Sequence, residues 1–233
     1  MPSVRAAKTV RLAKPAVKAA PSERVDVAQQ LRQRIANHEI APGTKLTEMD
    51  VAAEFGVPRP RVREALAMLE QRGLVERIPN KGAVVTRLEL DQVLAIYEAR
   101  EALEGLSVRL ATERSPKGHW KELLRHFNDE MPRLLADGKL DEVLSGYEMF
   151  RQRVFDAARN TVIQGMVDSI LERTQMVIRR AVILPGRAER GLSQHQAVLR
   201  AMDKGDAAEA ESLRKLNMRE AAEFVRRYHK FVI

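Results

Sequence analysis

Three arginines, Arg59, Arg61 and Arg63, stand at alternate positions near the start of the stretch GVPRPRVREALAMLEQRGLV. Guanidinium groups bind phosphate oxygens and the edges of bases, so such a cluster indicates a polyanionic partner. Apolar residues recur behind the arginines at helical spacing, namely Val62, Ala65, Leu66 and Leu69. We therefore predict a helix that opens with positive charge and carries Arg59 and Arg63 on one face.

The elements around this helix predict how it is used. A first helix is expected over Val27, Leu31 and Ile35, and a short second helix runs from Thr47 to Gly56. After Gly73 the apolar period changes to that of two strands, 74–78 and 83–88, which the sequence PNKG joins. Three helices and a hairpin make a winged helix-turn-helix, whose recognition helix enters the major groove of DNA N-terminus first. The alternative is a three-helix core with a solvated basic face.

The charge of the chain is unevenly distributed. The 233 residues carry a net charge of +8, but residues 1–22 contain five basic and no acidic residues, so the rest carries only +3. We predict that residues 1–22 form a disordered basic tail, which is either a solvated leader or an arm that grips DNA.

Composition excludes several classes of protein. The chain has no cysteine, so disulfides and thiolate metal sites are excluded, and no apolar run or leader predicts membrane insertion or export. We expect a cytoplasmic protein. Aromatic residues make up only 4%, and the composition favours helices.

Residues 31–88 resemble the DNA-binding domain of the GntR family of bacterial transcription regulators. The motifs PGTKL, EFGV, VREAL, LEQRGLV and PNKGAVV occur in the family's order and spacing. The resemblance implies that Arg59 and Arg63 contact the operator, that Gly82 lies at a wing tip inserted into the minor groove, and that Lys81 contacts phosphate. Pro58 and Pro60 replace residues that usually offer hydroxyls, and Arg61 takes over some of their phosphate contacts.

The remainder of the chain predicts an all-α bundle. Six helical segments are expected, at 91–114, 117–136, 139–158, 161–184, 188–204 and 206–230. The stretch YEAREALEGLSVRLAT and the segments after it resemble the FCD-type sensing domain of the FadR-like branch, and six helices suggest its VanR-like subgroup. We thus predict a mainly α protein with a winged helix-turn-helix at 23–88 and an effector-binding and dimerisation domain at 91–230.

The resemblance also implies where an effector binds. Many such domains hold a divalent metal with one Asp and three His, and alignment puts Tyr147, Arg151, His195 and Asn217 at those positions. With one of the four ligands left and an arginine among them, we expect no metal and no cofactor. We predict that these residues bind an effector, although His195 is alternatively a helix-start residue packed near Ser193.

The predicted function is that of a homodimeric regulator, a repressor, that binds a palindromic DNA operator. Arg151 is expected to bind a small-molecule carboxylate or acyl effector with its guanidinium fork, unless Glu148 or Glu172 neutralises it. One alternative is a DNA-binding regulator whose bundle is purely structural. A metal-dependent helical-bundle enzyme is disfavoured, because the chain lacks the Glu-x-x-His pairs of such sites and any phosphate-binding loop.

Overall fold

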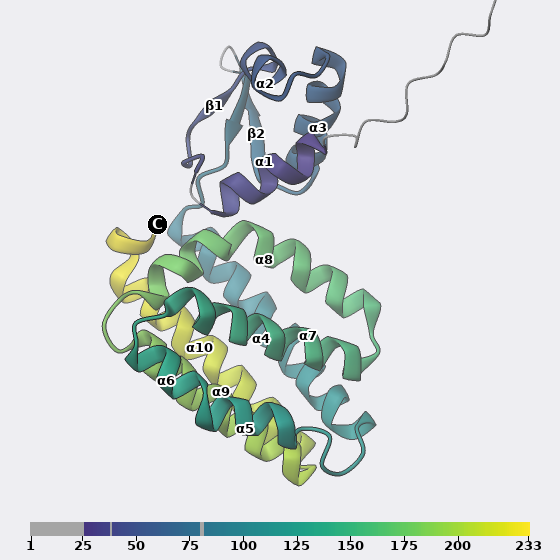
Figure 1. Cartoon of the computed structure of the whole chain (residues 1–233), viewed down its shortest axis with the longest axis vertical. Helices are drawn as coiled ribbons and strands as arrows, with labels where there is room; N and C mark the ends of the chain where they lie inside the picture. The colour runs from purple at the N-terminus through teal and green to yellow at the C-terminus, as the bar shows by residue number, and fades with distance from the viewer. Residues whose placement is uncertain (1–25, 38, 80–81) are drawn as a thin grey trace, which may run out of the picture.

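The computed structural model describes residues 26–37, 39–79 and 82–233. The predictions for the basic tail 1–22 and for Lys81 lie outside the described residues. The chain forms two parts, a small domain with helices and strands at one end and a larger helical bundle beneath it in Figure 1.

The small domain is a winged helix-turn-helix, as predicted. Its helices are α1 (Val27–Ala36), α2 (Glu48–Phe55) and α3 (Arg59–Gln71). The wing consists of β2 (Val75–Ile78) and β3 (Gly82–Val85), which pair antiparallel with Ile78 opposite Gly82. A two-residue strand β1 (Lys45–Leu46), which the sequence did not predict, pairs with the other edge of β3.

Local sequence signals explain where these helices begin and end. The Thr47 side chain accepts a hydrogen bond from the backbone N–H of Asp50 and caps α2, and Gly56 ends that helix in the left-handed conformation with a φ of 63°. Pro58 precedes α3, and Pro60 lies in its first turn, where a missing N–H loses no bond. The apolar faces of the three helices and the wing then bury one core, which includes Leu31, Val51, Val62, Leu69 and Val75.

The bundle is entirely helical. Its helices are α4 (Leu90–Arg114), α5 (Lys121–Asp129), α6 (Met131–Ala136), α7 (Leu140–Ala158), α8 (Thr161–Val182), α9 (Arg187–Lys204) and α10 (Ala207–Val232). The long helices α4 and α10 pack along each other. A mainly α protein with a winged helix-turn-helix before an all-α bundle is therefore confirmed.

Two details differ from the predicted helices. The predicted segment 117–136 begins with a turn and is divided into α5 and α6, because Pro132 has no N–H to donate to the carbonyl of Asn128. The prediction of six helices is therefore wrong: the described part of the bundle has seven, and the helix count does not support the VanR-like subgroup. His195, which one alternative placed at a helix start near Ser193, lies well inside α9, because this helix begins at Arg187, directly after Gly186 with a φ of 79°. The start of α9 follows this left-handed glycine.

The two parts meet through α8. Figure 1 shows α8 as the bundle helix that lies against α1 of the winged domain. Leu88, just before α4, and Leu90, its first residue, belong to one apolar cluster with Val177 of α8 and Val225 of α10. No helix in the described part of the chain is both long and apolar enough to span a bilayer.

Candidate functional site

The N-terminal half of α3 presents the predicted arginines to solvent. Arg59, Arg61 and Arg63 are all exposed. The guanidinium of Arg63 donates two hydrogen bonds to the carboxylate of Glu48, the first residue of α2, with Nε–Oε1 and Nη2–Oε2 distances of 2.8 Å each. These hydrogen bonds are the main reason why the pKa of Glu48 is lowered.

The basic surface extends from α3 to the wing. The charges of Arg77 on β2 and of Arg59 also lower the pKa of Glu48, so both lie close to the Arg63–Glu48 pair. Arg61 lies elsewhere, in a shallow groove beside Asp26 and Met68 between α1 and α3. The structure therefore groups Arg59 and Arg63 with Arg77, which the sequence analysis missed, and separates Arg61 from them.

Gly82 begins strand β3 with a φ of 82°. A Cβ atom at this position would meet no atom within 4 Å, so the backbone conformation alone favours glycine here. The predicted wing-tip partner, Lys81, is outside the described residues.

A cavity of about 460 Å³ is lined by residues of the bundle helices α4, α7, α8, α9 and α10 and by Arg32 of α1. All four residues predicted to bind an effector, Tyr147, Arg151, His195 and Asn217, line this cavity. The structure thus brings together positions that are up to 70 residues apart in the sequence. Whether they bind a ligand remains a prediction.

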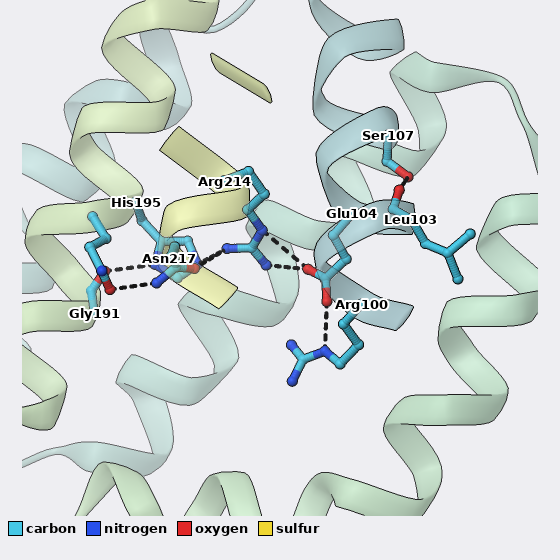
Figure 2. A network of polar contacts seen from close by, with 9 residues as sticks. Arg100, Leu103, Glu104, Ser107, Gly191, His195, Arg214 and Asn217 are labelled. Atoms are coloured by element: carbon cyan, nitrogen blue, oxygen red, sulfur yellow. Dashed lines mark hydrogen bonds and ion pairs between the residues drawn. The ribbon is translucent and has the colours of Figure 1, made fainter. Parts of the chain in front are cut away.

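A buried network of charged groups forms one side of the cavity (Figure 2). The Glu104 carboxylate on α4 accepts from Nε of Arg100 at 2.7 Å and from Nε of Arg214 on α10 at 3.2 Å, with a further bond from Nη2 of Arg214. Burial alone would raise the pKa of Glu104, but the charges of Arg100 and Arg214 lower it to about 2. Glu104 is therefore ionised at neutral pH.

Arg214 also reaches the predicted effector residues. Its Nη1 donates to Oδ1 of Asn217 at 2.7 Å and lies 3.1 Å from Nε2 of His195. Figure 2 shows the guanidinium between these two side chains and Glu104. Arg214 was not predicted as a site residue, although it is three residues from Asn217.

His195 is buried in the middle of α9, so the alternative that it is a helix-start residue is wrong. Its Nδ1 lies 2.8 Å from the carbonyl oxygen of Gly191 and donates to it, which leaves Nε2 as the acceptor facing Arg214. Burial, together with the charge of Arg214, lowers the pKa of His195 to about 3. The imidazole is therefore neutral, and it stacks on Tyr147 with ring centroids 4.3 Å apart.

These side chains do not fit a divalent metal. The one imidazole directs its acceptor nitrogen at a guanidinium, which would repel a cation, and the other three positions offer a phenol, a guanidinium and an amide. No cluster of three or more His, Asp or Glu side chains suited to a metal occurs in the described ranges.

The remaining two predicted residues have protein partners. Tyr147 donates its hydroxyl proton to the carbonyl oxygen of Ala188 at 3.1 Å, and burial raises its pKa, so it stays protonated. Arg151 pairs with Glu148 at 3.0 Å, one of the two acids considered as its neutralising partner. The other acid, Glu172, instead binds arginines of the winged domain.

Arg187, the first residue of α9, is a further cavity residue that sequence reasoning missed. Among the described residues, no ion pair involves Arg187, and burial lowers its pKa. The four-residue spacing of Arg100 and Glu104 does signal a helical ion pair. No local signal joins Glu104 to Arg214, which is 110 residues away, or marks Arg187 as a cavity residue.

Family comparisons agree with both parts of the fold. Residues 23–85 match the model of the bacterial regulatory proteins of the gntR family, and residues 95–220 match the FCD domain. The chain belongs to the GntR family. This GntR protein is a DNA-binding transcription regulator with an FCD domain, and it is not an enzyme.

Individual relatives support this assignment. The protein is 32% identical over 130 residues to an uncharacterised HTH-type transcriptional regulator of Agrobacterium vitis. The aligned region makes up 55% of this chain and 76% of the relative. It is 26% identical over 197 residues to the HTH-type transcriptional repressor RspR of Escherichia coli, covering 84% and 86% of the two chains. Among solved structures, E. coli McbR/YncC has the same fold, with a TM-score of 0.70 at 19% identity over 87% of this chain and 96% of that one.

Proposed function

We propose that this regulator is a repressor that binds a palindromic operator as a homodimer and is released by a small organic anion bound in the bundle cavity without a metal. The observation that carries the effector proposal is a small excess of positive charge in the cavity wall, where six arginines stand against four acids, Asp141, Glu148, Asp168 and Glu172. The buried cluster has two cations, Arg100 and Arg214, for one anion, Glu104, while His195 is neutral. Arg187 adds a third cation.

Such an excess favours an anionic ligand. A buried charge without a counterion is unfavourable, and a carboxylate from a ligand would neutralise part of the excess. The cavity volume of about 460 Å³ lies within the range of about 300 to 1,000 Å³ common for small-molecule sites. Apolar residues, among them Leu144, Ile178 and Met218, line other parts of the wall, so the ligand also needs a carbon skeleton.

We place the carboxylate of the ligand beside Arg187. A Cβ atom on Gly191 would lie 3.1 Å from Oη of Tyr147 and 3.3 Å from Nη1 of Arg187, so both groups lie close to the backbone of α9 and would have to shift by a few tenths of an ångström for a larger residue. A guanidinium can donate two parallel hydrogen bonds to a carboxylate. Arg151 provides a second contact, because its partner Glu148 is largely exposed and holds it only weakly.

The repressor and dimer proposals have separate support. RspR, which aligns with most of this chain, is named a repressor. A single recognition helix such as α3 covers only a few base pairs, so two protomers related by a twofold axis are needed to read a palindromic site. Light scattering of the protein with and without DNA would establish the stoichiometry.

The experiment that tests the effector proposal is a thermal-unfolding screen. A panel of mono-, di- and tricarboxylates, from acetate to decanoate and citrate, is added to the purified protein. At least one should raise the melting temperature in a concentration-dependent way, because it binds only the folded bundle. Elemental analysis of the same sample should find no stoichiometric zinc, nickel or manganese.

A matched pair of variants locates the site. Arg187→Gln should abolish the stabilisation, and Arg151→Ala should weaken it. Arg179→Gln removes the same charge from the same cavity, but Arg179 is more solvent-exposed than Arg151, at 37% against 25%, so the stabilisation should persist. A panel that never stabilises the protein would favour the second candidate function, a regulator whose bundle is purely structural.

A further inference from the structure

Glu172 on α8 joins the two parts of the molecule. Its Oε1 accepts from Nη1 of Arg32 on α1 at 3.1 Å and from Nη1 of Arg72, the residue that ends the recognition helix α3, at 2.7 Å. One carboxylate of the bundle therefore holds both the first and the last helix of the DNA-binding domain.

The same carboxylate lies at the effector cavity. Glu172 and Arg32 both line the cavity that contains Arg187, Tyr147 and His195. The Glu172 side chain is only 21% exposed, whereas Arg32 and Arg72 are 40% and 44% exposed. Because the ion pairs are partly buried, they can orient the winged domain. Because they are also partly solvated, they can break without leaving a fully buried charge.

Around the Glu172 ion pairs, the contact between the winged domain and α8 contains buried polar atoms that make no hydrogen bond. Oε2 of Glu172, Nε of Arg173 and Oγ1 of Thr86 are buried and have no hydrogen-bond partner within the described protein. All three residues line one small cavity of about 20 Å³ between the winged domain and α8. Unpartnered buried polar atoms are unfavourable, so they reduce the stability that the Glu172 ion pairs and the nearby apolar contacts give to this docked arrangement.

We propose that Glu172 is a positioning residue that holds the recognition helix in its operator-binding orientation and transmits occupancy of the cavity to it. In the ligand-free protein, Glu172 fixes Arg32 and Arg72. An anion in the cavity repels Glu172 and attracts Arg32, so both interactions weaken and the winged domain is released from α8. This transmission rests on the proposed effector function, whereas the positioning role does not.

Simple electrostatics predicts the opposite effect of removing Glu172. Deleting a negative charge beside a DNA-binding domain strengthens its attraction to phosphates and thus tightens binding to any DNA. A fall in operator affinity after this deletion would therefore report lost positioning. The matched control is Glu148, an acid of the same cavity whose only ion pair in the described protein is with Arg151.

The test compares full-length wild type, Glu172→Gln and Glu148→Gln. Each is titrated against an operator selected by the wild type from random-sequence DNA, and against a scrambled duplex. Glu172→Gln should bind the operator at least about fivefold more weakly, with no loss on the scrambled duplex, while Glu148→Gln keeps the wild-type affinity. Operator binding by Glu172→Gln that is equal to or tighter than wild type would overturn the proposal.

Two further measurements separate positioning from other causes. A double-variant cycle combines Arg32→Gln with Glu172→Gln. Because both substitutions break the same ion pair, the double variant should lose no more operator affinity than the more affected single variant. Additive losses would contradict the positioning role of Glu172. A carboxylate that stabilises the wild type in the panel should still stabilise Glu172→Gln but no longer change its operator affinity. If no carboxylate binds the wild type, the effector proposal fails, and the ligand-free comparison still decides the role of Glu172.

Discussion

Two arginine–glutamate pairs, one in each part of the molecule, have similar geometry and different surroundings. Arg63 and Glu48 in the winged domain are 62% and 32% exposed. Arg214 and Glu104 in the bundle are 5% and 4% exposed. In both pairs a guanidinium donates more than one hydrogen bond to a carboxylate.

The difference in exposure decides what each arginine can do. Water solvates Arg63 and Glu48 if they separate, so the pair contributes little, and Arg63 is free to move to an operator. Arg214 cannot leave Glu104 without exposing an uncompensated buried charge. The exposed arginine is thus suited to bind a partner, and the buried one is a fixed cation that shapes the cavity.

The largest expected effect comes from breaking the buried pair. Glu104→Gln leaves Arg100 and Arg214 without a counterion, and loss of one partner of a buried pair costs about 3 to 5 kcal/mol of unfolding free energy. The free energy of unfolding is measured by denaturant titration, with the fluorescence of Trp120, the single tryptophan, as the signal from the bundle. The exposed pair Arg109–Glu113 supplies the control, and an equally large loss in Glu113→Gln would remove the distinction between the two kinds of pair.

The exposed arginine should matter for DNA and little for stability. Arg63→Ala is expected to lower operator affinity by roughly one to two orders of magnitude, with a much smaller effect on scrambled DNA, because we propose that Arg63 reads a base edge. Fluorescence anisotropy with both duplexes measures this. Arg61→Ala, on the other side of α3, should lower operator affinity by a smaller factor. If Arg63→Ala weakens binding to both duplexes equally, Arg63 contacts phosphate instead of a base.

The buried imidazole should make stability depend on pH. The pKa of His195 is about 3 in the folded bundle, against about 6.5 in the unfolded chain, so only the unfolded chain binds this proton as the pH falls below 6.5. His195 therefore removes up to about 1.4 kcal/mol of stability per pH unit between pH 6.5 and 3. His195→Gln should flatten this dependence, whereas the exposed His119→Gln should not; parallel curves for His195→Gln and wild type would count against a neutral buried imidazole.

The smallest effect is expected at the acid that pairs with Arg63. Glu48 competes with DNA for this guanidinium, so Glu48→Gln should tighten binding to the operator and the scrambled duplex alike by a small factor. The gain should shrink as salt is raised. Weaker operator binding would instead show that Glu48 orients Arg63 for base contact.

Local signals were sufficient to predict most of the fold. The arginine-led helix, the glycine-containing hairpin and the helical periods of the bundle each depend on neighbouring residues, and the winged helix-turn-helix and all-α bundle follow from them. The two-residue strand β1 was missed because its partner, β3, is distant in sequence. The division at Glu130 was missed because the segment was treated as continuous through Pro132.

The candidate site was predictable only where resemblance supplied the positions. Tyr147, Arg151, His195 and Asn217 do line one cavity. The charges that define its chemistry come from contacts between distant helices, such as Glu104 with Arg214, and from Arg187, whose sequence neighbourhood is unremarkable. Glu172 was considered only as a partner of Arg151, because nothing in a linear sequence shows that α8 meets α1 and the end of α3.

We propose that an anion in the bundle cavity weakens the binding of the winged domain to DNA. The most direct measurement is a titration of the wild-type protein–operator complex with the carboxylate that stabilises the protein most. Fluorescence anisotropy of the labelled operator monitors how much DNA stays bound. We expect saturable release of the operator over the concentration range that stabilises the bundle, and no release from the Arg187→Gln complex. Saturation of the bundle with the operator still fully bound would contradict it.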